Sequence, residues 1–400
     1  MFSHFAFARR MRPCVARCSL LSAAIVFAAA FVGRSAWAQD QSAELTGAAL
    51  ETAKALETVD SSGASTFAAN APADFVYEGV VLNTPAQMSS QAADFNDENE
   101  GGANGSDIGN ANPYWQIFVQ STQPNDFGGV AIYMAQNYGN IPGVGSAGFV
   151  GGSFVPDPTS DYSDAAWNAQ VQRLDYYNND QNTVGGATLS AGQQIQAGDE
   201  VIIFARGGLD FGGKYNINEE HTATTDYASD PQYSFDIFYV ASHGMPTPIA
   251  LNLNDYNGTT NPTGLWDAST DSVLFDATRA TGAEHYQGDW VTLDAVKLVT
   301  PNDPNWVSNG VVTVENAAGN EFSVQLGTAN FGSAPTGYFN ATGIFDQESG
   351  MGPETGGYEV WVMNPTDIVA TPEPSTLILA AIALGSLVGW KALRRRTVTT

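Results

Sequence analysis

The sequence predicts an all-β body built as two tandem five-stranded barrels, with one short helix in the first. From Asp74 onward, runs of aromatic and β-branched residues alternate with clusters of Gly, Asn, Asp and Pro, a pattern typical of short strands joined by turns. A repeat is the second observation. The segments that begin at Gly198 and Gly337 each run from a candidate strand through a turn to a Gly-Gly pair and a further strand. The two halves are therefore expected to share one strand order.

Residues 1–38 precede this body and differ from it in composition. They hold five arginines and no acidic residue, and the apolar run Ser19–Val32 is followed by small residues at Ala36 and Ala38. A basic start, a short apolar run and an A-x-A site predict a secretory signal peptide. The alternative, a permanent transmembrane anchor, would need a longer apolar run.

Cysteine content and charge narrow the possible classes of function. Cys14 and Cys18 both lie in the signal segment, so the mature chain has neither disulfides nor thiolate metal sites. Residues 39–370 hold 41 acids and six bases, a net charge of −35. Because nucleic-acid binding depends on Lys and Arg to neutralise phosphates, we expect no nucleic-acid partner. The same charge attracts cations such as Ca²⁺ and keeps the body soluble.

Residues 39–73 are rich in Ala, Ser and Thr. Leu45, Ala49 and Leu56 follow a helical spacing, so a short helix is one alternative. We interpret the segment instead as a low-complexity stalk exposed to solvent.

The first β domain is expected over residues 74–250. One helix, at Ser163–Leu174, interrupts its strands and has its apolar residues on one face. A helix between a third and a fourth strand is the arrangement of a five-stranded OB barrel. Gly139–Ser160 is then a long surface loop. The predicted strands are Phe75–Leu82, Tyr114–Gln120, Gly129–Met134, Glu200–Arg206, Lys214–Asn218 and Ser234–Val240.

The second β domain is expected over residues 262–370. Met245–Leu251 contains two prolines and, with residues 251–261, is interpreted as a stiff linker. Only Gly327–Thr336 separates the third and fourth strands of this domain, so no helix is expected there. Its predicted strands are Trp290–Val299, Val311–Glu315, Phe322–Leu326, Tyr338–Phe345 and Tyr358–Met363.

Several short motifs add to this arrangement. They are Gly79-Val80-Val81, Trp115–Val119, Asp289–Leu293, Thr342–Phe345 and Asp367-Ile368. Together they resemble the tandem OB-like modules of bacterial extracellular proteins, some of which are attached to secreted nucleases. The resemblance covers residues 74–370 and implies two OB-like barrels. The nuclease part is absent from the sequence, and the second copy departs from the pattern because it lacks the helix.

The C-terminal segment 371–400 has three parts in a fixed order. Pro372-Glu373-Pro374 favours extended backbone, the uncharged run 377–390 follows, and Arg394, Arg395 and Arg396 come last. Fourteen helical residues span about 21 Å, short of the ~30 Å hydrocarbon core. The arginines are expected to stay on the cytoplasmic side.

This order resembles the PEP-CTERM sorting signal. The resemblance implies a bacterial protein that is exported through the inner membrane and processed by an exosortase-type enzyme. The body would then be released or attached at the cell surface. Such systems are linked with exopolysaccharide, and Glu373 would be part of a substrate rather than a catalytic residue. The alternative is an ordinary C-terminal anchor.

Residues that could support catalysis are sparse. His221, His243 and His285 are the histidines of the mature chain, and none has a spacing such as H-E-x-x-H. No G-x-S-x-G motif supports a serine nucleophile. We therefore expect a protein that is not an enzyme, with no catalytic residue and no required cofactor.

Two weaker hypotheses concern ligands. Asp94, Asn96, Asp97 and Glu98 could hold Ca²⁺ on a flexible loop, but the loop lacks the Gly and Glu positions of an EF-hand, and a solvated hairpin loop is the preferred interpretation. A second possibility is an exposed aromatic face that stacks on sugars. Its candidate residues are Phe118, Tyr133, Tyr358 and Trp361.

Taken together, the sequence predicts a non-enzymatic protein of the bacterial cell surface or extracellular matrix. It would pass through an inner-membrane intermediate and be sorted by an exosortase-type system. Two alternatives remain open: a module that binds glycan or Ca²⁺-bridged polysaccharide, and an accessory of a secreted hydrolase or nuclease.

Overall fold

The computed structural model describes residues that all belong to one compact unit starting at Ala48. Some predicted features lie outside these residues: the signal peptide with Ala36 and Ala38, the loop from Asp94 to Glu98, most of the Ser163–Leu174 helix, His221, and the tail from Pro372 onward. The described residues are 48–67, 74–88, 115–134, 149–150, 153–154, 174–177, 194–205, 208–219, 235–349 and 353–371.

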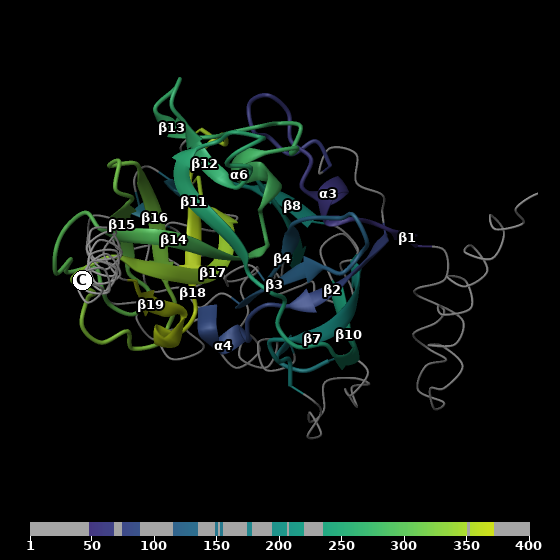
Figure 1. Ribbon diagram of the computed structural model, residues 1–400. Coiled ribbons are helices and arrows are strands. Elements are labelled where there is room, and N and C mark those ends of the chain that lie inside the picture. The colour runs from purple at the N-terminus through teal and green to yellow at the C-terminus, as the bar shows by residue number, and fades with distance from the viewer. Residues whose placement is uncertain are drawn as a thin grey trace, which may run out of the picture. The chain divides into compact units, whose positions relative to one another are not determined.

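The first sheet has eight strands in the order β10-β7-β2-β3-β4-β9-β8, and β1 pairs with β2. The pairs β4–β9 and β1–β2 are parallel and the others are antiparallel. Figure 1 shows these strands in purple to teal. The bounds are β1 Ala49–Leu50, β2 Phe75–Val81, β3 Trp115–Ser121, β4 Gly129–Met134, β7 Asp199–Ala205, β8 Gly208–Phe211, β9 Lys214–Glu219 and β10 Phe235–Ser242.

The second sheet has nine strands in the order β13-β12-β11-β14-β15-β16-β18-β17-β19. An additional pairing of β14 with β17 closes β14, β15, β16, β18 and β17 into a five-stranded barrel. The bounds are β11 Ile249–Asp255, β12 Gly264–Asp267, β13 Ser272–Val273, β14 Trp290–Leu298, β15 Val311–Glu315, β16 Glu321–Leu326, β17 Phe339–Gln347, β18 Tyr358–Val362 and β19 Ile368–Ala370.

The described part of the chain is mostly β, with few and short helices. They are α3 Ala53–Leu56, α4 Pro85–Met88, α6 Gly282–His285 and the 3-10 turn η4 Pro365–Asp367. A separate two-stranded hairpin joins β5 Phe149–Val150 to β6 Ser153–Phe154.

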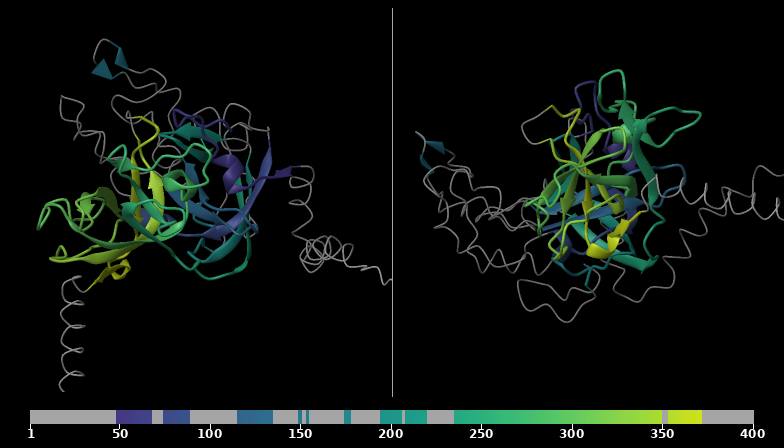
Figure 2. Two further views of the ribbon diagram at one scale, coloured as in Figure 1. Left: turned by 45° about the horizontal axis from the view of Figure 1, so that its top comes forward. Right: turned by 60° about the vertical axis from the view of Figure 1, so that its left-hand side comes forward.

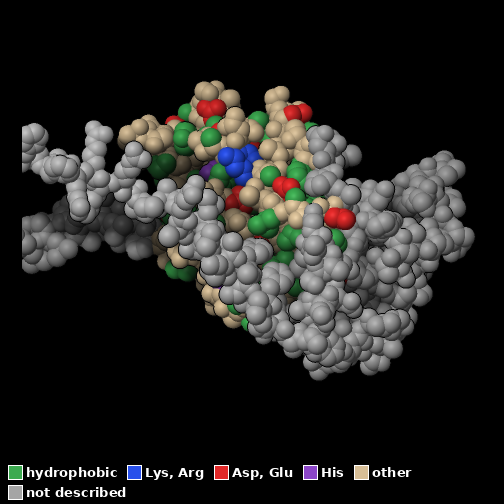
Figure 3. Space-filling model, turned by 90° about the vertical axis from the view of Figure 1, so that its right-hand side faces the viewer, with side chains coloured by type: hydrophobic (Ala, Val, Ile, Leu, Met, Phe, Trp, Pro, Cys, Tyr) green, Lys and Arg blue, Asp and Glu red, His purple; other side chains and the backbone are tan. Residues whose placement is uncertain are grey.

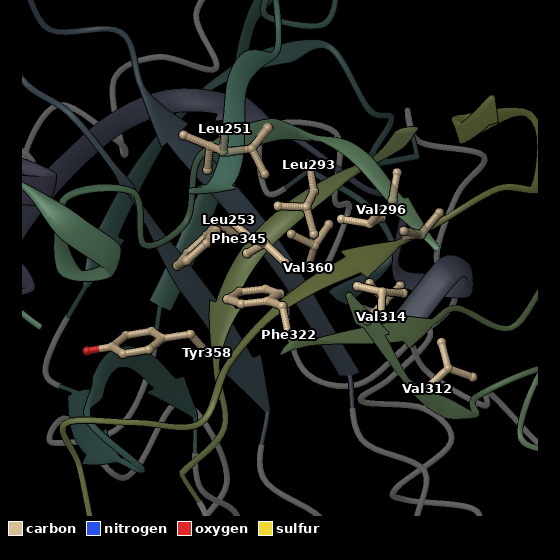
Figure 4. Close-up of a cluster of buried hydrophobic side chains, with 14 of the residues drawn as sticks. Leu251, Leu253, Leu293, Val296, Val312, Val314, Phe322, Phe345, Tyr358 and Val360 are labelled. Carbon is tan, nitrogen blue, oxygen red and sulfur yellow. The ribbon is translucent and has the colours of Figure 1, made fainter. Parts of the chain in front are cut away.

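Each sheet has its own apolar core, because apolar residues alternate along the strands. On β16, Phe322, Val324 and Leu326 are buried as the alternation predicts. Figure 4 shows the second core, where side chains from β11, β14, β15, β16, β17 and β18 converge. The first core is centred on buried aromatic and aliphatic residues of β2, β3, β4, β7, β9 and β10.

A third apolar cluster lies between the two sheets. Phe118 and Ala131 from β3 and β4 pack with Trp290, Ile344 and Trp361 from the barrel. These residues point away from the core of their own sheet. Figures 1 and 2 show the two groups of strands side by side, and the cluster shows that they contact each other through buried side chains.

The interpretation of residues 251–261 as a linker is wrong for its first half. β11 pairs in parallel with both β12 and β14, and Leu251 and Leu253 are fully buried in the barrel core. The sequence carried the signal, since Leu251 and Leu253 alternate with Asn252 and Asn254 in a period-2 pattern. Both prolines precede β11, the second at Pro248, so every residue of the strand keeps a backbone N–H for hydrogen bonding.

The expected solvent-exposed stalk also differs from the structure where residues 48–67 are described. β1 pairs with β2, and Ala53 and Leu56 of α3 are fully buried in the first core. The alternative of a short helix is matched only in part, because Ala49 lies in β1 and the helix is limited to the single turn Ala53–Leu56. The apolar side of that turn is covered by the first sheet.

Candidate functional site

A buried ion pair joins the two sheets. Lys214 Nζ at the start of β9 lies 2.8 Å from Asp346 Oδ1 and 2.9 Å from Oδ2, near the end of β17. It also lies 2.6 Å from Oε1 of Glu348. The side chains of Lys214 and Asp346 are 5% and 1% exposed, whereas Glu348 is 37% exposed. A cation from one sheet is thus neutralised by carboxylates of the other.

Strand alternation explains why these polar side chains meet. On β9, Tyr215 and Ile217 enter the first core, so Lys214 points to the opposite face. On β17, Phe345 enters the barrel core, so Asp346 points outward. Both outward faces meet in the layer between the sheets. The Lys214 ammonium also lies over the ring of Phe118, 5.5 Å from its centroid.

A second acid is placed opposite Asp346. In the antiparallel register of β17 and β18, Asp346 pairs with Glu359, and neighbours of this kind project from the same face. Burial, with the charges of Asp346 and Glu348, raises the pKa of Glu359 to about 8. Burial raises the pKa of Asp346 to about 6, although Lys214 opposes the shift. Burial alone would lower the pKa of Lys214, but the two carboxylates outweigh it and raise that pKa.

A second buried group surrounds Arg279, which is 1% exposed. Its Nε donates to the backbone oxygen of Glu284 at 2.7 Å, and its Nη1 donates to the backbone oxygen of Ala53 at 3.2 Å. The Tyr358 hydroxyl donates to Glu284 Oε1. In Figure 4 that hydroxyl points away from the other labelled core side chains. Arg279 therefore connects α3, in the N-terminal segment, to the segment that precedes the barrel.

Two more carboxyl groups of this region are buried. Glu57 accepts from the backbone N–H of Tyr215 at 3.0 Å, and Asp289 accepts from the backbone N–H of Gly128 at 3.1 Å. Burial raises the pKa of each carboxyl group to about 8, and the positive charge of Arg279 offsets only part of this rise. Both carboxyl groups are therefore largely protonated at neutral pH.

The N-terminal segment is fastened to this region through its helix. Asp126 accepts from the first backbone N–H groups of α3, at Ala53 and Lys54, with distances of 2.8 and 3.0 Å. Thr52 accepts from Ala55 as the N-cap. A carboxylate at a helix N-terminus is favourable, so Asp126 ties residues 52–57 to the turn before β4.

Phe127 is the centre of a small aromatic and basic contact. His285 stacks on it with ring centroids 4.0 Å apart, and Lys54 and Arg279 lie 5.4 and 5.6 Å from its centroid. On the face shown in Figure 3, a small basic group lies beside a histidine among mostly uncharged side chains. Burial lowers the pKa of His285. His285 is the last residue of α6.

The hypothesis of an exposed aromatic face is not supported. Phe118, Tyr358 and Trp361 are buried, and only Tyr133 is half-buried. Phe118 and Trp361 form the contact between the sheets, and Tyr358 belongs to the barrel core. The alternation on each strand does not distinguish an outer face open to solvent from one covered by another sheet. His243 is exposed and precedes Gly244, which has a positive φ, as a turn requires.

The sequence interpretation missed the buried charged residues altogether. A signal did exist at Lys214, one of only six bases in a body with 41 acids, at a strand position opposite the core face. Within the described residues, no group of three or more His, Cys, Asp or Glu side chains is arranged to hold a metal ion. The same residues contain no helix of the length and apolarity needed to span a membrane.

The described chain ends in a strand of the barrel sheet. β19 pairs antiparallel with β17 through Phe339, Asn340 and Ala341, and the backbone N–H of Thr371 donates to Tyr338 at 2.8 Å. Asn364 and Asp367 form a capping box around η4, which turns the chain from β18 into β19. The folded body therefore reaches to the residue before Pro372.

Comparison with known families identifies the PEP-CTERM protein-sorting motif at residues 370–396. The match begins at the last residue of β19 and contains the Pro372-Glu373-Pro374 sequence and the arginine cluster. Neither the curated proteins nor the solved structures contain a match to this chain. The motif implies export, membrane-associated sorting by an exosortase-type enzyme, and a surface location.

Proposed function

We propose that this protein is a non-enzymatic component of the bacterial cell surface or extracellular matrix. The PEP-CTERM motif at residues 370–396 carries the proposal, because it makes the C-terminus a sorting signal. The folded body is then the part of the protein that the sorting system delivers to the surface. Its buried charged side chains support a structural role, since they join the two sheets and the N-terminal segment.

We also propose that both sheets are OB-like modules. In each, three successive strands are antiparallel neighbours: β2-β3-β4 in the first and β14-β15-β16 in the second. In each, the third strand pairs in parallel with a later strand, β9 or β18, and the first strand pairs with β7 or β17. The shared order supports an OB-like strand order in both sheets, whereas among the described strands a closing pair is found only in the second sheet, through β14 and β17. In the first sheet, the second edge of β7 pairs with β10.

Among possible partners, exopolysaccharide is consistent with the sorting system, and a nucleic acid is disfavoured by the net charge of −35 over residues 39–370. The glycan-binding alternative loses three of its four aromatic candidates, because Phe118, Tyr358 and Trp361 are buried. The property that remains for a partner to recognise is the net negative charge of the body.

The sorting step is tested in the native host by replacing Pro372, Glu373 and Pro374 with alanine. The variant should be exported but retained in the inner membrane at full length. The wild type should reach the surface or the medium without residues 377–396. The mass of the C-terminal peptide of the surface form decides the matter. A mature wild-type protein that still carries residues 377–396 would overturn processing and leave the tail as an ordinary anchor.

A further inference from the structure

The pair formed by Lys214 and Asp346 has the elements of a covalent cross-link as well as those of a salt bridge. Nζ is almost equally distant from the two carboxylate oxygens, at 2.8 and 2.9 Å. This is the arrangement of a bidentate ion pair, and it holds the nitrogen and the carboxyl group that an amide would join in direct contact; the side chain of Lys214 must still move out of the carboxylate plane before its nitrogen can attack Cγ. Both side chains are buried, at 5% and 1% exposure.

We propose that Lys214 and Asp346 condense to form an intramolecular amide between Nζ and Cγ, which covalently joins the two sheets. The two residues are 132 positions apart in the chain, and each belongs to a different sheet. An exported body without cysteine has no disulfide available. An amide at this position would close a long loop of the unfolded chain, which is how disulfides stabilise secreted domains.

Two neighbouring carboxyl groups are candidates for the proton transfers, one in contact with Nζ and one on the adjacent strand. Glu348 Oε1 lies 2.6 Å from Nζ and can accept a proton from the nitrogen. Glu359 stands opposite Asp346 in the register of β17 and β18. Since burial raises the pKa of Glu359 to about 8, this group carries a proton at neutral pH, as a donor to the departing oxygen must.

The condensation balances without an oxidant or a second substrate. Nζ first gives one proton to the Asp346 carboxylate, and its lone pair then forms a bond to Cγ while the carbonyl electrons move to oxygen. Glu348 takes a second proton from the nitrogen. The carbonyl re-forms as the C–OH bond breaks, and Glu359 protonates the departing oxygen, so that one water leaves. Glu348 then returns a proton to Glu359, and both groups end as they began.

The surroundings hold the two groups together and keep bulk water away, although the same carboxylates raise the pKa of Lys214 and so oppose the first proton transfer. Holding two reacting groups together raises their effective concentration to about 10⁵–10⁸ M in well-oriented cases. Burial under Phe118 and the barrel sheet excludes the bulk water that surrounds a surface pair. Lys297 and Glu315 give the matched comparison, because their 2.9 Å contact has side chains that are 42% and 23% exposed.

The test is the mass of the folded, full-length chain after denaturation, followed by peptide mapping. The chain should be lighter than its sequence by one water molecule. A proteolytic digest should contain one branched peptide that joins the Lys214 and Asp346 segments, and none that joins Lys297 to Glu315. Lys214→Arg and Asp346→Ala should restore the uncondensed mass. Lys297→Arg should still lose the water.

Glu359→Gln separates the chemistry from folding. This variant keeps the shape of the side chain but cannot give up a proton, so condensation should slow by about 10²-fold or more, the usual contribution of a general acid. Circular dichroism and protease resistance confirm that it is folded. A folded wild-type chain with its full mass and no branched peptide after prolonged incubation at neutral pH would overturn the proposal and leave a salt bridge only.

Discussion

Gly288, just before β14, lies directly against Gly129 at the start of β4. A Cβ on Gly288 would overlap the carbonyl group of Gly129, and Gly288 has a φ of +74°. Next to this contact, the backbone N–H of Gly129 donates to the oxygen of Gln287 at 2.8 Å. The two halves of the body thus meet backbone to backbone, at a place where only glycine fits.

Gly288→Ala should therefore destabilise the protein more than a substitution that only strains the backbone. The positive φ and the overlap with Gly129 together should cost roughly 2–5 kcal/mol. Gly332, with a φ of +66° and no atom within 4 Å of an added Cβ, is the matched control, and its alanine variant should lose about 1–2 kcal/mol. Urea unfolding of both variants measures the difference, and equal losses would contradict it.

Removing the carboxyl partner of the buried Lys214 should cost more than removing the partner of a surface lysine. Asp346→Ala leaves the ammonium of Lys214 buried beside Phe118 with only the partly exposed Glu348 as a partner. A loss of about 3–5 kcal/mol is expected, as for other buried pairs. Glu315→Ala, which removes the partner of Lys297, should cost about 1 kcal/mol or less. Chemical denaturation monitored by tryptophan fluorescence compares the two. Similar small losses would mean that Lys214 reaches solvent.

Stability should fall as the pH rises from about 5 to about 8. Burial raises the pKa of Glu57, Asp289 and Glu359 to about 8 in the folded state, so the fold binds protons that the unfolded chain releases near its ordinary carboxyl pKa. The stabilisation from these three carboxyl groups is fully present below their pKa in the unfolded chain. It is lost as the pH rises through their pKa in the folded protein. Each group contributes a slope of about 1.4 kcal/mol per pH unit within this window.

Glu57→Gln provides the control for this pH dependence. The amide cannot titrate. The loss of unfolding free energy per pH unit between pH 5 and 8 should therefore be smaller by the contribution of one carboxyl group. Thermal unfolding at several pH values measures it. A wild-type stability that rises over the same interval would show that these carboxyl groups are ionised in the folded protein.

Leu253→Ala tests whether β11 is part of the barrel. The side chain is fully buried in the barrel core, so its truncation should cost about 2–5 kcal/mol. Asp255→Ala, at the exposed end of the same strand, should change stability by less than about 0.5 kcal/mol. The two are compared by urea unfolding. A Leu253→Ala loss as small as that of Asp255→Ala would return residues 251–261 to the role of a linker.

Many strands of the body could be predicted from local pattern, but β8, β11, β12 and β13 were not among the predicted strands. β4 and β15 have the predicted bounds, and most of the others differ by one or two residues, because aromatic and β-branched runs between turn residues carry that information locally. The C-terminal sorting motif could be predicted as well, since Pro372-Glu373-Pro374 and the arginine cluster act as a linear signal that depends on order rather than on folding.

The tertiary structure decided which outward faces are covered. Strand alternation places Lys214, Phe118, Asp346 and Trp361 opposite their own cores, but it does not say whether water or another sheet lies beyond. In this fold a second sheet lies there, so the aromatic residues are contacts rather than a binding face, and Lys214 meets Asp346 across 132 residues. The raised pKa values of the buried carboxyl groups have the same origin. The pKa of a carboxyl group depends on its surroundings, and these surroundings are assembled from parts of the chain that are distant in sequence.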